Sequence, residues 1–199
     1  MRSPASRLGL LGLALAALAL AVPHRALTQD TPPTTAAPSA GPRTEAQLRT
    51  LLGGAWHLVQ SEATARQRID QGIERCVSEM NYFLQGVARD QMRENTPINR
   101  RIDIGFEGTS SITVNFDQRF SYTTRPGVAQ QFDLPDGSSV NVRQYFREDH
   151  FEQYFEATLG RRWSVYRLSE DGRTMTVSAT QQGPMMPVPM HFTLDYRQR

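Results

Sequence analysis

The side chains that could do the most varied chemistry in this sequence, its histidines, are few and far apart. His57 and His191 alternate with apolar residues of predicted strands, so both are expected to face away from a core, and His150 falls in a predicted turn. A zinc site needs three or four ligands that converge on one point. The spacing of these histidines predicts no such metal site.

A methionine-rich stretch near the C-terminus is a second candidate for chemistry. Residues 183–191 read GPMMPVPMH, and thioether and imidazole groups together suit copper. The prolines favour another interpretation, an apolar loop beside a pocket mouth. The only cysteine, Cys76, excludes an intramolecular disulfide, and its place on an apolar helix face predicts a buried, unreactive thiol. No cofactor is predicted.

Polar residues that share a strand face with apolar ones point to binding. Buried polar groups need partners, and a cavity with a few converging polar groups is how ligand sites are usually built. Arg167 alternates with Trp163 and Val165 and could hold a carboxylate with two parallel hydrogen bonds. Alternatively, Arg167 reaches solvent from its strand end. The predicted ligand-binding residues are Gln144, Gln153, Phe155, Trp163, Arg167 and Tyr196.

Catalytic motifs are missing from the sequence. It has no G-x-S-x-G nucleophile elbow, no Walker-type glycine-rich loop, no H-E-x-x-H and no C-x-x-C. The predicted inward faces contain no His–Asp or Tyr–Asp pair. The sequence therefore predicts a protein that binds a small molecule without chemical conversion.

The elements that must position these residues are mostly strands. From Arg101 onward, apolar residues recur with period two, and turn signals return roughly every ten residues. With a first strand at 55–60 and a weak one at 130–134, this gives about ten strands. Their second faces are polar, which is typical of an antiparallel meander. A meander of this size closes into a barrel and so removes its exposed edges.

Helices are predicted before and after the first strand. A short helix follows Thr44, with Gln47 in the capping-box position. After the first strand, Ser61 or Thr64 caps an amphipathic helix that Gly86 can divide in two and that ends by Asn95. Its placement predicts a cap over the barrel mouth, with a cavity under Ile73, Val77 and Met80. The apolar stripe comprises Ile69, Ile73, Cys76, Val77, Met80, Phe83, Leu84 and Val87.

The N-terminal region carries export and linker signals. Arg2 and Arg7 precede an apolar run over 8–22, which predicts a signal peptide at 1–26 and a periplasmic or secreted protein. The alternative is a retained membrane anchor, for which the run is slightly short. Residues 27–43, rich in Pro, Thr and Ala, are expected to form a disordered linker. Residues 44–199 are predicted to be one domain.

The charge balance excludes some partners. The chain has 22 Lys+Arg and 20 Asp+Glu, and leaving out Arg2 and Arg7 makes the counts equal. A protein without a basic surplus is not expected to bind nucleic acid. After signal removal, no stable membrane insertion is expected either.

The layout resembles the calycin superfamily. A strand that begins Gly54-Ala55-Trp56, helices before the second strand, a meander and a last strand ending in arginines are similar to its fatty-acid-binding-protein branch more than to the lipocalins. The resemblance implies that Trp56 plugs one barrel end, with Arg197 or Arg199 lying across it. That branch holds a ligand carboxylate with an Arg-x-Tyr pair on the last strand. Here Leu194 and Tyr196 take those positions.

The sequence thus predicts a mainly β fold: a closed antiparallel meander barrel of about eight to ten strands, with a helical insertion between the first and second strands and a short N-terminal helix. The predicted function is to carry or sequester an apolar or amphipathic small molecule outside the cytoplasm. The alternative is an extracytoplasmic enzyme or interaction domain on a helix-grip or cone-shaped α+β fold.

Overall fold

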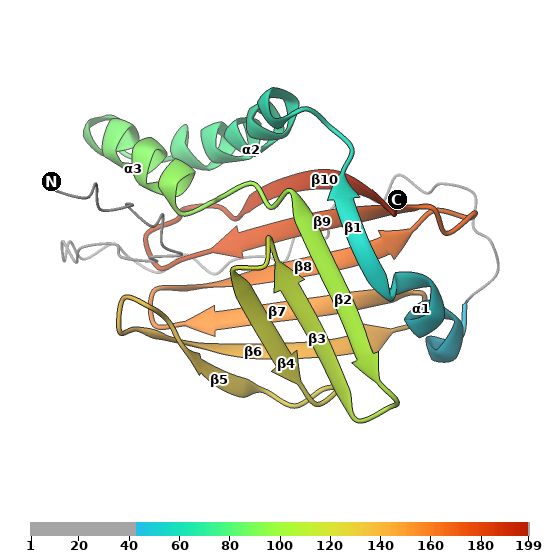
Figure 1. The fold of residues 1–199 in the computed structure, drawn as a ribbon. Coiled ribbons are helices and arrows are strands. Elements are labelled where there is room, and N and C mark those ends of the chain that lie inside the picture. Colours follow the sequence, from blue (N-terminus) through green and yellow to red (C-terminus); the bar gives the residue numbers. More distant parts are fainter. Residues whose placement is uncertain (1–42, 199) are drawn as a thin grey trace, which may run out of the picture.

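A computed structural model describes residues 43–198, and in it one antiparallel sheet curls into a nearly closed barrel (Figure 1). The strand order is β4-β3-β2-β1-β10-β9-β8-β7-β6-β5. The predicted fold class is confirmed. The predicted signal peptide and nearly all of the predicted linker lie outside the described residues. The strands are β1 (Gly54–Leu58), β2 (Arg101–Glu107), β3 (Ser111–Phe116), β4 (Phe120–Thr124), β5 (Gln130–Asp133), β6 (Ser139–Arg147), β7 (His150–Ala157), β8 (Gly160–Leu168), β9 (Thr174–Gln182) and β10 (Met190–Gln198).

The first strand joins the beginning of the meander to its end. Trp56 lies opposite Ile102 of β2 on one side and Gln198 of β10 on the other. Trp56 is fully buried, as predicted, and its Nε1 donates to the Leu52 carbonyl at 2.8 Å. Arg197 pairs with His57 and is exposed, so it does not lie across Trp56, and Arg199 is outside the described residues.

Between β4 and β5 the barrel has a seam that side chains bridge. The Thr124 hydroxyl donates to Oε1 of Gln144 at 3.1 Å, and Nε2 of Gln144 donates to the Tyr122 carbonyl at 3.3 Å. The Gly127 amide donates to the Gln144 carbonyl at 2.8 Å. Gln144 therefore takes the place of a strand ladder between β4 and β6.

Helix α1 (Glu45–Leu52) covers the barrel end that contains the β2–β3 and β8–β9 turns. Thr44 and Gln47 form the predicted capping box. Leu48 and Leu52 are fully buried, and Nη1 of Arg49 donates to the Gly108 carbonyl at 2.9 Å. This end of the barrel is closed by side chains.

Helix α2 (Glu62–Val77) begins at the N-cap Ser61 and packs on β10. Gly72 permits a close approach, because a Cβ at this position would overlap the carbonyl oxygen of His191. Cys76 is fully buried, as predicted, and its Sγ donates to the Val188 carbonyl at 3.1 Å. Burial raises the pKa of this thiol.

The predicted apolar stripe packs on the core through α2 and Met80, but not along the helix that follows. A second helix, α3 (Tyr82–Glu94), starts after the N-cap Asn81, earlier than the predicted break at Gly86. Phe83 and Val87 are 87% and 70% exposed, so their predicted place on the buried stripe is wrong. Leu84 is exposed as well. The break between the helices changes the helical phase, so α3 turns its apolar side outward. In the described part of the chain, no helix has the length and apolar character needed to cross a membrane.

Candidate ligand cavity

A cavity of about 190 Å³ lies at the barrel end away from α1. Its rim comes from the segment after α3, the β5–β6 turn and the β7–β8 turn. None of Ile73, Val77 and Met80 lines it, so the cavity does not lie under that part of the insertion as predicted. The rim includes Asn95, Pro97, Asn99, Leu134, Asp136, Ser138, Thr158 and Leu159.

One wall of the cavity is aromatic. Phe116, Tyr122 and Phe155 line it. The rings of Tyr122 and Phe155 meet edge to face, with centroids 5.2 Å apart and planes at 79°. Tyr122 meets Phe132 in the same way at 5.2 Å. Such pairs give a rigid apolar surface on which a ring or an alkyl chain can pack.

Arg162 of β8 brings a positive charge into this apolar site. It lines the cavity, and its Nε is out of contact with solvent and has no hydrogen-bond partner. Among the described residues, no carboxylate forms an ion pair with it. Burial lowers the pKa of its guanidinium, yet arginine stays protonated in proteins. Arg162 is half-buried, and its guanidinium carbon lies 5.6 Å from the centroid of the Phe192 ring. Its charge is thus partly removed from water without an anionic partner, which is unfavourable.

A second donor without an acceptor lies close to Arg162. Gln153 is fully buried, and its Oε1 accepts from the Tyr166 hydroxyl at 2.7 Å, but its Nε2 has no partner. In the ladder between β7 and β8, Phe155 is opposite Arg162 and Gln153 is opposite Ser164. Gln153 and Arg162 are therefore diagonal neighbours, within reach of each other for long side chains.

Two buried tyrosines complete the surroundings of Arg162. Burial raises the pKa of both Tyr166 and Tyr196, which keeps their hydroxyls neutral. The Tyr196 hydroxyl donates to the Asn99 carbonyl at 3.0 Å. It thereby fastens the segment after α3 to the last strand at the cavity rim.

The structure separates the six predicted site residues. Phe155 lines the cavity, and Gln153 lies next to Arg162. Gln144 and Tyr196 are buried, but the protein itself uses their polar groups. Trp163 is 41% exposed and Arg167 is exposed, so their predicted inward placement is wrong.

The inward face of β8 is the opposite one to that predicted. It carries Arg162, Ser164 and Tyr166, whereas Trp163 and Arg167 lie on the outer surface. Sequence reasoning missed Arg162 and Tyr166. A signal was available in the short β7–β8 turn, which places Ala157 opposite Gly160. Because residues two apart share a face, Arg162 must lie on the same side as the inward Ala157.

His150, predicted to fall in a turn, is the first residue of β7 and is buried. It is 6% exposed, with Nδ1 2.9 Å from Asp149 Oδ1 and Nε2 2.7 Å from Glu152 Oε1. These groups lie on the outer face of β7, away from the cavity. Within the described residues, no group of three or more histidine, cysteine or acidic side chains is arranged to hold a metal.

Comparison with known proteins finds no matching family model and no matching curated protein. Solved structures do match. They include a fatty acid transporter named REP1-NXSQ (15% identity, 74% of this chain and 96% of that chain, TM-score 0.46). A fatty-acid-binding protein from Drosophila melanogaster brain matches at 13% identity, 74% and 99% coverage and TM-score 0.44. A secretory abundant heat-soluble protein from Ramazzottius varieornatus matches at 8% identity, 75% and 96% coverage and TM-score 0.47. By its own strand order and the helices between β1 and β2, the chain has the predicted calycin-like architecture.

Proposed function

We propose that this protein binds a small amphipathic molecule with an anionic head, and that Arg162 holds the head. The observation that carries the proposal is a half-buried arginine that lines a mostly apolar cavity, with its Nε out of contact with solvent and no carboxylate partner in the described chain. A ligand carboxylate would supply the missing charge in a planar, two-bonded arrangement. The ligand's apolar part would pack on the wall formed by Phe116, Tyr122 and Phe155.

The polar groups near Arg162 fit an acceptor-rich head. Gln153 does not line the cavity, but its free N–H and the Nε of Arg162 are neighbouring donors without an acceptor, and a carboxylate offers acceptors only. Asp136 at the rim forms no ion pair with Arg162 in the described structure, and its Oδ1 accepts instead from the amide and hydroxyl of Ser138. The described lining contains no histidine or cysteine, so the cavity favours binding over catalysis.

We further propose that the protein works outside the cytoplasm after cleavage of residues 1–26. The support is the charged start and the apolar run at 8–22. N-terminal sequencing of the protein isolated from its native cells should place the mature start between Val22 and Thr31. Full-length protein recovered from the cytoplasm would contradict export.

Calorimetric titration with octanoate and 1-octanol tests the role of Arg162. Arg162→Met keeps the length of the stem and removes the charge. We expect it to weaken octanoate binding about ten- to hundredfold, the worth of a charged hydrogen bond, and to leave 1-octanol binding nearly unchanged. The control is Arg161→Gln, because Arg161 is exposed and bonds to Gln182 on the outer face. Equal octanoate affinity in Arg162→Met and the parent would contradict the proposal.

The same variant gives a test that needs no ligand. If Arg162 is kept for binding, it destabilises the empty barrel, and replacing this half-buried charge, which has no carboxylate partner in the described chain, by an apolar side chain should leave the protein equally or more stable. Urea unfolding of the ligand-free proteins measures this. A loss of more than about 2 kcal/mol in Arg162→Met would show that Arg162 supports the fold instead.

A further inference from the structure

The barrel interior is filled at one end and open at the other. The rings of Phe106, Phe146, Phe151 and Tyr166 form a continuous chain, with successive centroids 5.7, 5.4 and 5.1 Å apart. The guanidinium of Arg49 closes this chain from α1, 5.2 Å from the Phe106 ring centroid and 4.9 Å from that of Phe146. We call these four aromatic residues the plug.

A polar layer separates the plug from the cavity. Gln144 and Gln153 are fully buried in neighbouring strands and lie opposite each other in the β6–β7 ladder. Gln144 is held by Thr124 and Tyr122, and Gln153 by Tyr166. A ligand that pushed deeper would have to break these hydrogen bonds and displace packed rings. Neither the plug nor this layer contributes to the cavity lining.

The volume of the cavity limits the size of the ligand. The cavity measures about 190 Å³, and a dry protein cavity of about 150 Å³ is known to hold one benzene molecule. The open half therefore has room for about eight carbon atoms by the same measure. Building on the proposed function, we infer that the ligand is a short acid, either an alkanoic acid of about eight carbons or a carboxylate with one aromatic ring, and that the plug excludes the tails of long-chain lipids.

A series of straight-chain acids from four to sixteen carbons, titrated calorimetrically below their micelle concentrations, tests this limit. Each added methylene that becomes buried should tighten binding about fourfold. We expect this gain up to about eight carbons and a flat affinity beyond, where the tail leaves the mouth. 3-Phenylpropionate should bind about as well as octanoate. A gain that continues to sixteen carbons would overturn the limit.

Variants that enlarge the cavity test whether its walls set the limit on ligand length. Phe155→Ala and Leu134→Ala remove side chains that line the cavity. In each variant, the affinity should keep rising to longer acids than in the parent protein before it levels off. Phe83→Ala is the matched control, because Phe83 is exposed on α3. If the affinity levels off at the same chain length in both lining variants as in the parent, the cavity does not set the length limit and the inference is wrong.

The outcomes separate the inference from the proposed function. Absence of binding at every chain length, or binding that Arg162→Met does not weaken, would overturn the proposed function. Binding that needs Arg162 but strengthens up to sixteen carbons would overturn only the size limit. Binding that needs Arg162 and stops strengthening near eight carbons supports both.

Discussion

Helices α2 and α3 belong to the same insertion but meet the rest of the protein in opposite ways. Helix α2 buries Ile69, Ile73 and Val77 against the barrel. Helix α3 buries only Met92 and exposes large apolar side chains near its start. The apolar spacing of three and four residues is present in both. That spacing therefore indicates a helix but does not tell which of its sides is covered.

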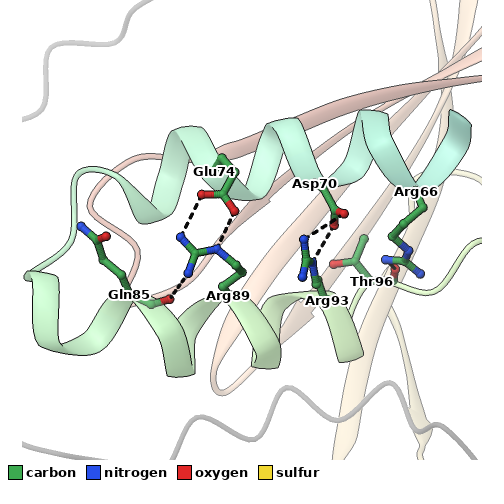
Figure 2. A network of polar contacts seen from close by, with 7 residues as sticks. All are labelled: Arg66, Asp70, Glu74, Gln85, Arg89, Arg93 and Thr96. Atoms are coloured by element: carbon green, nitrogen blue, oxygen red, sulfur yellow. Dashed lines mark hydrogen bonds and ion pairs between the residues drawn. The ribbon is translucent and has the colours of Figure 1, made fainter. Parts of the chain in front are cut away.

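The attachment of α3 explains its orientation. Two arginines of α3 face α2 and bind its carboxylates, as Figure 2 shows. Nε and Nη2 of Arg89 donate to Glu74 at 2.5 and 2.9 Å, and those of Arg93 donate to Asp70 at 2.9 and 3.0 Å. Because the polar side of α3 is used for this contact, its apolar side is left to solvent. Helix α2 is therefore held mainly by apolar burial against the barrel, and helix α3 mainly by ion pairs with α2.

The largest expected effect is on the buried side of α2. Ile73→Ala removes a fully buried side chain, so it should lower the free energy of unfolding by about 2 to 5 kcal/mol. Val87→Ala, at the exposed side of α3, should change it by less than about 0.5 kcal/mol. Urea unfolding monitored by circular dichroism compares the two. Similar losses in both variants would show that α3 is covered in solution.

The two glycines inside the helices are expected to respond to alanine with smaller changes in stability, and with opposite signs. Alanine is usually favoured over glycine inside a helix by about 1 kcal/mol, and Gly86→Ala meets no atom within 4 Å, so this variant should be stabilised. Gly72→Ala would press against the carbonyl of His191, and overpacking of this kind costs about 1 to 3 kcal/mol. The same unfolding experiment measures both. Stabilisation by Gly72→Ala would mean that α2 is not seated on β10 as described.

The smallest effect concerns the ion pairs between the helices. The hydrogen bond from Arg89 lowers the pKa of Glu74 below its ordinary value of 4.5. This stabilisation is fully present above the unfolded-state pKa and is lost as the pH falls through the lower folded-state pKa. Both groups are partly exposed, so Glu74→Gln should lower the unfolding free energy by less than about 1 kcal/mol at low salt, and by less still at 1 M NaCl. A loss that does not depend on salt would argue against an electrostatic contact.

Much of the fold could be predicted from the sequence, because the local signals for most strands and for the first helix agree with the structure. Turn residues and period-two alternation mark nearly every strand, and Thr44 with Gln47 marks the start of α1. The orientation of α3 could not be predicted in this way. It depends on contacts between side chains of two helices, Glu74 with Arg89 and Asp70 with Arg93, and hydrophobic spacing does not report these contacts.

The candidate site was predicted only in part, and strand β8 shows why. Its outer face holds Trp163 and Val165 between two arginines, whereas its inner face holds Arg162 and Ser164 before Tyr166, so neither face is clearly the apolar one. A rule that places the apolar face inside must fail on a strand whose inner face carries a polar site. Phe155 and Gln153 were predicted correctly to face inward, because their strand keeps the ordinary pattern. Local conflict with a packing rule is expected at functional sites.

The buried thiol of Cys76 makes the seating of α2 measurable without any engineered probe. It is the only cysteine in the chain, and it is enclosed between α2 and the segment before β10. A thiol-reactive dye can reach it only when the helix leaves the barrel, so the labelling rate reports how often that local opening occurs. The rate in native buffer would then distinguish brief detachment of α2 from unfolding of the whole barrel.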